Sequence, residues 1–179
     1  MIGQRLALLA AASALLASCA SADAAAELPA GPVVDLADIL PADEEALLDR
    51  HLRAYFRDYG TAIVVASVAS LEGKTIEQVA FETFNTWGIG SSDDDRGLLI
   101  LVAPNERKVR IEVGCGLESV ITDEFAGIVI DDNILPQFLL GDFPGGIEAG
   151  VDALAEELAD HPDAHALSPL CLDPERQAA

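Results

Sequence analysis

The chain has 179 residues, of which 51% are hydrophobic, so it is long enough for one domain with a proper core and too short for two. Its 31 aspartates and glutamates outnumber 10 lysines and arginines, and the net charge of -21 excludes binding to a nucleic-acid backbone. Such acidity fits a soluble protein that repels anionic surfaces and attracts divalent cations, although solvated acidic helix faces are the commoner cause.

The N-terminus is typical of an export signal. Arg5 precedes an apolar stretch over residues 6–17 that is too short to span a bilayer as a helix. The residues that follow, Leu-Ala-Ser-Cys19, resemble the bacterial lipobox, which implies cleavage before Cys19 and lipidation of that cysteine. Because Ala20 follows and not aspartate, the same resemblance indicates the outer membrane, facing the periplasm. The alternative is ordinary cleavage at a small-x-small site within residues 20–24, which leaves a soluble secreted or periplasmic protein.

The chain divides into four parts. Residues 1–18 are the predicted signal peptide, and residues 19–32 form a lipid-anchored tether of alanine and proline with little periodicity. The folded domain covers residues 33–159. An irregular tail over 160–179 is indicated by its His-Pro, Ser-Pro and Asp-Pro pairs.

A helix and a strand open the folded domain. The helix is predicted after Pro41, because three acids fill its first turn, where the helix dipole favours negative charge. Gly60 ends this helix, and the almost wholly apolar residues 61–68 follow as a central strand. His51 is assigned no chemistry, since a lone histidine on an apolar helix face is more often a packing residue than a ligand. The predicted apolar stripe of the helix contains Leu47, Leu48, His51, Leu52, Tyr55 and Phe56.

A second helix and a hairpin come next. Thr75 and Gln78 have the spacing of a capping box at the start of the helix. The apolar run 98–103 is typical of a strand buried on both faces, and the alternating residues 108–113 are typical of a half-exposed antiparallel partner. The turn-rich residues 104–107 connect them as a hairpin. The predicted apolar face of the helix contains Ile76, Val79, Ala80, Phe84 and Trp87.

Two further helices complete the predicted layout. Thr122 can cap the first of them, and Asp131, Asp132 and Pro136 indicate a bend or a break within it. The last helix is predicted to begin near Pro144. The fold class is therefore α/β, with a small mixed sheet built from a right-handed parallel βαβ unit and an antiparallel hairpin. Helices on both faces make a three-layer sandwich.

Two acid-bearing loops are predicted to meet at one edge of this sheet. The loop over residues 91–96 precedes the first hairpin strand, and the loop over 114–119 follows the second. Antiparallel pairing of the two strands places both loops at the same edge. This edge is the best candidate site in the sequence.

The residues from 33 to 158 resemble a TPM domain, the family that includes a thylakoid-lumen phosphatase, a photosystem accessory protein and a worm receptor modulator. The motifs that carry the resemblance are VVDLADILP, FNTWGIG, DRGLLIL, RKVRIEVGCGLE and GDF followed by GI. Arg96 stands where many members have asparagine, and Cys115 stands where an aromatic residue is usual. The resemblance implies divalent-metal binding by acids at the loop edge of the sheet and, in one branch, acid phosphatase activity.

Carried over position by position, the resemblance assigns metal binding to Asp95, Glu118 and Asp123, and Asp94 is an added local candidate. Carboxylates from two adjoining loops suit Ca²⁺ or Mg²⁺, and a bound metal could polarise a phosphoryl oxygen or activate water. The bland alternative needs no metal: aspartate runs are common in solvated loops, Glu118 can brace its own loop, and Asp123 suits the first turn of a helix. Catalytic residues stay unassigned.

Cys115 and Cys171 remain once Cys19 is set aside. An oxidising compartment permits them to pair, which would pin the tail beside the glycine-rich loop, and the alternative is two unpaired thiols. Cys115 has no histidine or second cysteine at metal-ligand spacing, so it is not expected to act as a nucleophile.

The expected function is that of an exported, lipid-anchored and non-enzymatic accessory module. It would assist the assembly, repair or quality control of a membrane protein complex and could bind a divalent metal. The anchor, the tether and the lack of a recognisable nucleophile or base support it. The alternative is a metal-dependent acid phosphatase of the periplasm.

Overall fold

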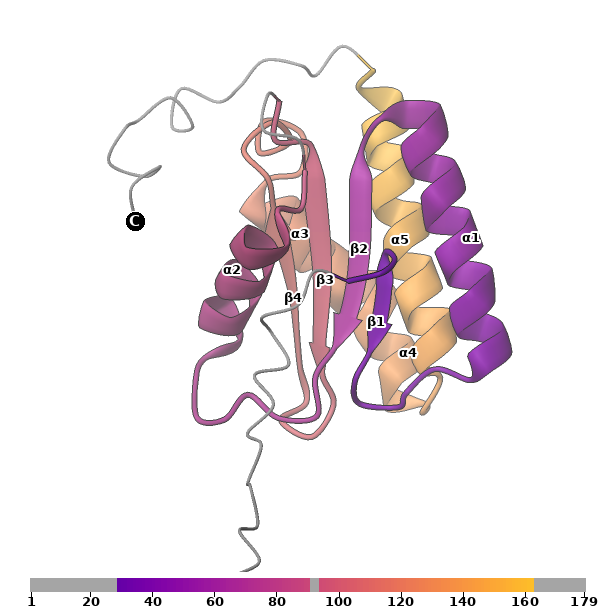
Figure 1. Ribbon diagram of the computed structural model, residues 1–179, viewed down its shortest axis with the longest axis vertical. Coiled ribbons are helices and arrows are strands. Elements are labelled where there is room, and N and C mark those ends of the chain that lie inside the picture. Colours follow the sequence, from indigo (N-terminus) through magenta and orange to yellow (C-terminus); the bar gives the residue numbers. More distant parts are fainter. Residues whose placement is uncertain (1–28, 91–93, 163–179) are drawn as a thin grey trace, which may run out of the picture.

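The computed structural model describes residues 29–90 and 94–162, which contain all the helices and strands shown in Figure 1. The predicted signal peptide, the predicted lipidation site Cys19 and the tail residue Cys171 lie outside these ranges. Among the helices of the described ranges, none is both long enough and apolar enough to cross a membrane.

A four-stranded mixed sheet forms the centre of the domain (Figure 1). Its strands lie in the order β1 (Val33–Asp35), β2 (Ala62–Ser67), β3 (Gly97–Ala103) and β4 (Lys108–Val113). The first three strands are parallel, and β4 is antiparallel to β3. The predicted parallel unit and the predicted hairpin are thus both confirmed.

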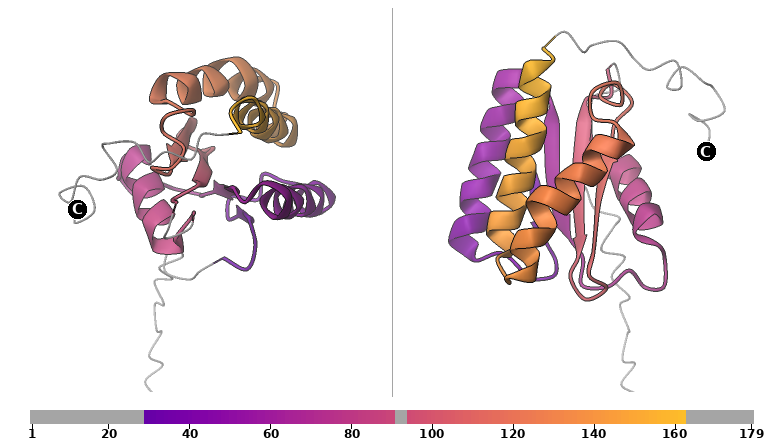
Figure 2. Two further views of the ribbon diagram at one scale, coloured as in Figure 1. Left: turned by 90° about the horizontal axis from the view of Figure 1, so that it is seen from above. Right: turned by 180° about the vertical axis from the view of Figure 1, so that it is seen from behind.

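Helices cover both faces of the sheet, as predicted. One face carries α2 (Ile76–Trp87), which packs mainly against β3 and β4 (Figure 2). The buried side chains of α1 and α5 belong to a second apolar cluster on the opposite face. The other helical elements are α1 (Ala42–Tyr59), α3 (Asp123–Ile128), the π-helix η1 (Val129–Ile134), α4 (Leu135–Leu139) and α5 (Phe143–Asp160).

The predicted helix caps are present. The hydroxyl of Thr75 accepts the backbone N–H of Gln78, and the Gln78 side chain accepts the backbone N–H of Thr75, so the capping box is complete. Thr122 caps α3 through the N–H of Phe125 at 3.2 Å. Gly60 ends α1 in a left-handed conformation with φ of 71°. Local sequence therefore fixes where these helices begin and end.

β1 was not predicted as a strand, and it is held by a small polar network. Asp35 accepts hydrogen bonds from the Ser67 hydroxyl and from the backbone N–H of Leu40, the latter at 2.8 Å. The Ser67 oxygen in turn accepts the N–H of Ala37 at 2.9 Å. Asp38 has a φ of 54° in the turn that leads to α1. The VVDLADILP motif thus joins the edge strand to the first helix.

The predicted break in the third helix takes the form of the π-helix η1, placed between α3 and α4. Here the N–H of Leu135 donates to the carbonyl of Ile130, five residues back. Such a turn widens the helix just before Pro136, whose ring nitrogen carries no N–H. α5 approaches this region closely at Gly146, where an added Cβ would lie 2.6 Å from the Phe138 ring and 2.9 Å from the Ile134 carbonyl.

The apolar stripe predicted for α1 is narrower than expected. Leu48 and Leu52 are buried in the core. Leu47 and Phe56 are 53% and 55% exposed, and His51 is exposed. Tyr55 is half-buried and packs against the same core. The helix therefore buries part of the predicted stripe and leaves its other apolar side chains at the surface.

Candidate functional site

The two acid-bearing loops meet at the end of the sheet where β3 begins and β4 ends, as predicted (top of Figure 1). Their described parts are joined by backbone hydrogen bonds: the N–H of Gly114 donates to the carbonyl of Gly97 at 2.8 Å, and that of Gly116 donates to the carbonyl of Asp95 at 3.1 Å. We call residues 94–97 and 114–118, together with Asp123, the acid-loop edge.

Asp95 is the central residue of the acid-loop edge. Its Oδ2 accepts the backbone N–H of Cys115 at 2.8 Å. With the two backbone bonds above, the N–H groups of residues 114, 115 and 116 all donate to oxygen atoms of residues 95 and 97. Asp95 itself has a φ of 46°, a left-handed conformation that aspartate and asparagine adopt more readily than most residues. The side chain therefore braces the two loops against each other.

Glycines are required around this brace because the backbones approach too closely for a side chain. A Cβ added at Gly116 would overlap the carbonyl oxygen of Asp94, and one added at Gly114 would overlap that of Asp95. At Gly97 an added Cβ would lie 2.6 Å from the carbonyl oxygen of Ile89. Gly114 and Gly116 thus permit the contact between the two loops, and Gly97 permits the close approach of residues 89–90.

Arg96 points part of its guanidinium toward β2. Its Nη2 donates to the Thr61 hydroxyl at 2.9 Å, and its backbone carbonyl accepts the N–H of Ala62. Burial raises the pKa of Tyr55, Tyr59 raises it further, and the positive charge of Arg96 acts in the opposite direction. Arg96 therefore links the acid-loop edge to the start of β2 through both its side chain and its backbone.

The remaining predicted ligands lie in different surroundings. Asp94 is exposed and Glu118 is half-buried, and both make interactions within the folded chain. The Asp123 side chain is 93% exposed, with its Oδ1 at 3.9 Å from Nη2 of Arg110. Arg110 also pairs with Glu112 through its Nε at 3.1 Å. Asp123 thus neighbours a cation at the surface.

A divalent cation needs several oxygen ligands that converge on one point. Within residues 29–90 and 94–162, no group of three or more histidine, cysteine, aspartate or glutamate side chains is placed to hold a metal. One carboxylate oxygen of Asp95 is already engaged by the Cys115 N–H. The described donors do not fit a four-carboxylate site, and Asp93 lies outside the described residues. Metal binding by Asp94, Asp95, Glu118 and Asp123 stays a prediction.

Cys115 is bonded in a disulfide. Its partner lies outside the described residues, as do both other cysteines of the chain. The pairing of Cys115 with Cys171 therefore stays a prediction. A nucleophilic role for Cys115 is incompatible with this bonded state, because only a free thiolate attacks.

A groove of about 450 Å³ that was not predicted from the sequence lies between α2 and the strands β1 and β2. No motif marks it, because its walls come from separate segments that only the folded sheet brings together. We call it the α2 groove. Its lining residues are Leu36, Ala66, Ser67, Val68, Ala69, Ser70, Leu71, Glu72, Lys74, Val79, Glu82, Thr83, Trp87 and Leu101.

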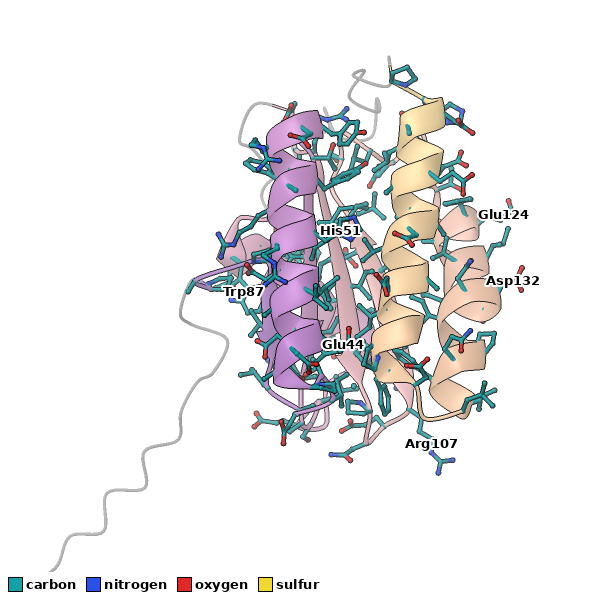
Figure 3. All side chains as sticks on the ribbon, turned by 90° about the vertical axis from the view of Figure 1, so that its right-hand side faces the viewer. Glu44, His51, Trp87, Arg107, Glu124 and Asp132 are labelled. Carbon is teal, nitrogen blue, oxygen red and sulfur yellow. The ribbon has the colours of Figure 1, made fainter. Side chains whose placement is uncertain are left out.

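A smaller hollow of about 240 Å³ lies between the N-terminal half of α1 and the start of α5. Glu44 and His51 line it from α1, and Glu148 lines it from α5. Figure 3 shows Glu44 and His51 on α1 beside α5, whereas Trp87 lies beyond α1, toward the opposite side of the sheet. The labelled Glu124 and Asp132 lie on the far side of α5 from α1 (Figure 3). The two hollows are thus separate surfaces.

Several solved structures share this fold, among them those of three bacterial proteins. The N-terminal domain of a P. gingivalis protein is 27% identical, with a TM-score of 0.68 over 76% of this chain and 87% of that one. A protein from the psychrophilic bacterium Bizionia argentinensis is 21% identical, with a TM-score of 0.61 over 75% and 90% of the two chains. The N-terminal domain of a Corynebacterium glutamicum protein is 19% identical, with a TM-score of 0.55 over 79% and 86%. The last two show the fold alone.

A comparison with curated proteins finds no match. A comparison with protein-family models matches residues 33–157 to the family described as the TPM domain. The matched range contains every described strand and nearly the whole of α5.

Proposed function

The chain belongs to the TPM domain family, and we propose that it is an exported, lipid-anchored accessory module without an enzymatic activity of its own. In this proposal the domain binds proteins and assists the assembly, repair or quality control of a membrane protein complex. A lipid on Cys19 and the tether that follows it would keep the domain at the periplasmic face of the outer membrane.

The bracing role of Asp95 carries the non-enzymatic part of the proposal. A metal-dependent phosphatase needs carboxylates whose lone pairs face the metal and the phosphoryl group. Here Oδ2 of Asp95 faces the Cys115 N–H at 2.8 Å, and the surrounding glycines leave no room for a side chain. The acid that best matches the family pattern therefore has a sufficient structural role.

The alternative is a metal-dependent acid phosphatase of the periplasm. The matching family model carries the word phosphatase in its name. One contact favours this alternative: Arg110 lies 3.9 Å from Asp123 and so places a cation beside a predicted metal ligand. The Asp123 side chain is highly exposed, however, so water and salt screen its interaction with Arg110. The same screening would weaken the binding of a phosphate at this position.

The proposal is tested in cells that produce the wild type, Cys19→Ser or the neighbouring control Ser21→Ala. After crosslinking and membrane fractionation, the wild type and Ser21→Ala should copurify with subunits of a membrane complex. Cys19→Ser should move to the soluble fraction and lose them. Fractionation that is the same for all three proteins would contradict the lipid anchor.

Phosphate release by the purified protein is measured in parallel with Ca²⁺ and with Mg²⁺. No activity above buffer is expected. Activity that requires the metal and disappears in Asp95→Asn would contradict the non-enzymatic function and establish the phosphatase.

A further inference from the structure

We propose that the α2 groove binds a short extended segment of a partner protein, composed of apolar residues with at least one lysine or arginine. The proposal deepens the accessory function above and rests on it for the kind of partner. Its own basis is the shape, the polarity and the charge of the groove.

The groove has an apolar floor and partly exposed apolar walls. Ala66 and Leu101 lie at its base and are 1% and 0% exposed. Leu36 borders it from the end of β1 and is 48% exposed, and Val79 borders it from α2 and is half-buried. Water therefore contacts apolar surface that an apolar occupant would cover, and removal of such surface from water favours binding.

The length of the groove fits an extended segment. Val79 and Trp87 both line it from α2, and eight residues of helix correspond to about 12 Å along the axis. An extended chain rises about 3.3 Å per residue, so the wall accommodates roughly four residues. The volume of about 450 Å³ lies within the range of protein ligand pockets. The site suits a short strand of another chain.

The charge of the groove favours a basic occupant. Glu72 and Glu82 stand at its rim together with one cation, Lys74, which pairs with Glu82 at 2.6 Å. The whole chain carries a net charge of -21. A lysine or arginine in the segment would be attracted to this surface, whereas an anionic lipid surface would be repelled.

Trp87 gives the groove an aromatic wall with an unused donor. Its indole Nε1 is buried and has no hydrogen-bond partner among the described residues, which is an unfavourable state for a buried polar group. A backbone carbonyl of an occupant that reaches the indole would satisfy this N–H. A peptide supplies such carbonyls at every residue, whereas a purely hydrocarbon ligand supplies none.

The same residue provides the test, since Trp87 is the only tryptophan in the sequence. The purified protein is titrated with a capped peptide of alternating leucine and valine that has a lysine at each end, and Trp87 emission is recorded. A saturable blue shift is expected. Two matched peptides, one with glutamate for lysine and one with serine for leucine and valine, should bind roughly tenfold more weakly or not at all.

Variants then localise the binding. Leu36→Lys places a repelling charge in the groove and should weaken the lysine peptide about tenfold or more. Leu47→Lys is the matched control, because Leu47 is similarly exposed at 53% but lies on α1, away from the α2 groove. It should leave the affinity unchanged. Circular dichroism confirms that both variants fold.

Several outcomes would overturn the proposal. They are the absence of any emission change in a folded wild type, equal binding of the glutamate peptide, and equal weakening by Leu47→Lys. Emission that depends on protein concentration without peptide, and no longer does so in Leu36→Lys, would show that a second copy covers the groove. Copurification with a membrane complex together with failed peptide binding would contradict the groove proposal and leave the accessory function intact. Peptide binding without any membrane partner would contradict the accessory function and leave the groove proposal intact.

Discussion

The acid-loop edge and the α2 groove differ in what the sequence displays and in what the fold leaves accessible. The acid-loop edge contains two adjacent aspartates and glycines at positions 97, 114 and 116, yet its backbones are hydrogen-bonded together around Asp95. The α2 groove has no motif, yet it is open, apolar and lined by Trp87, whose buried indole N–H has no partner in the described part of the chain. Residues that form a recognisable sequence motif therefore identify where the backbone is constrained. An open surface is identified only after the strands and helices are in place.

The strongest test of the closed edge is Gly116→Ala. The new Cβ would overlap the carbonyl of Asp94, which is backbone and has little freedom to move. We expect a loss of about 3 kcal/mol or more in the free energy of unfolding, measured by urea denaturation. Gly127→Ala is the matched control: in α3 an added Cβ meets nothing within 4 Å, so it should change stability by no more than about 1 kcal/mol. Equal stability of the two variants would mean that the loops are not in close contact.

The second test separates a brace from a metal ligand at Asp95. Asp95→Ala removes the acceptor of the Cys115 N–H and places alanine at a φ of 46°, so it should cost about 1–3 kcal/mol. Asp95→Asn keeps an acceptor oxygen and a residue that tolerates this conformation, and should cost less than about 1 kcal/mol. Urea denaturation without metal measures both. An asparagine variant as unstable as the alanine variant would indicate that the negative charge itself is needed.

The third test concerns the open groove. Trp87→Phe removes an N–H that has no partner among the described residues and keeps an aromatic ring in the wall. Stability should therefore change by less than about 1 kcal/mol, because no hydrogen bond is lost. Thermal unfolding followed by circular dichroism measures it. A larger loss would show that packing of the indole ring against the core of this face, and not its N–H, determines its contribution to stability.

The smallest effect is expected at Asp123. Its side chain is 93% exposed and 3.9 Å from Arg110, so Asp123→Asn should change stability by less than about 0.5 kcal/mol. Calorimetric titration with Ca²⁺ and Mg²⁺ extends the test to metal binding. If the four predicted carboxylates act as one site, Asp95→Asn and Asp123→Asn must both abolish binding. The exposed position of Asp123 predicts that its variant leaves any binding unchanged.

Most of the architecture could be predicted because its signals are local. The apolar run that forms β3 and the alternating residues of β4 are strand patterns within a single segment, and the caps at Thr75 and Thr122 need only the next three residues. β1 escaped prediction because it has three residues, too few for a period. Its extended form depends on pairing with β2 and on the contact between Asp35 and Ser67, 32 residues apart.

The sites were less predictable for the same reason. The sequence shows that the two acid-bearing loops meet, because hairpin geometry requires it. It does not show that Asp95 turns its carboxylate to an N–H 20 residues later. Nor does it show that Leu36, Ala66 and Val79 border one groove, because these residues come from three different elements or their ends. Long-range contacts decide both questions.

The short length of the edge strand β1 affects how readily copies of the domain could associate through their sheets. An exposed strand edge can pair with the edge of another molecule, and short edge strands are one of the ways in which proteins avoid such aggregation. β1 offers only three residues, and the turn that follows it contains Asp38 in a left-handed conformation that cannot extend the strand. If the proposed lipid anchor at Cys19 concentrates the domain on a membrane, many copies would collide edge to edge. At the β1 edge, a three-residue strand gives such collisions too few hydrogen bonds to become permanent, whereas the opposite edge of the sheet is the six-residue β4.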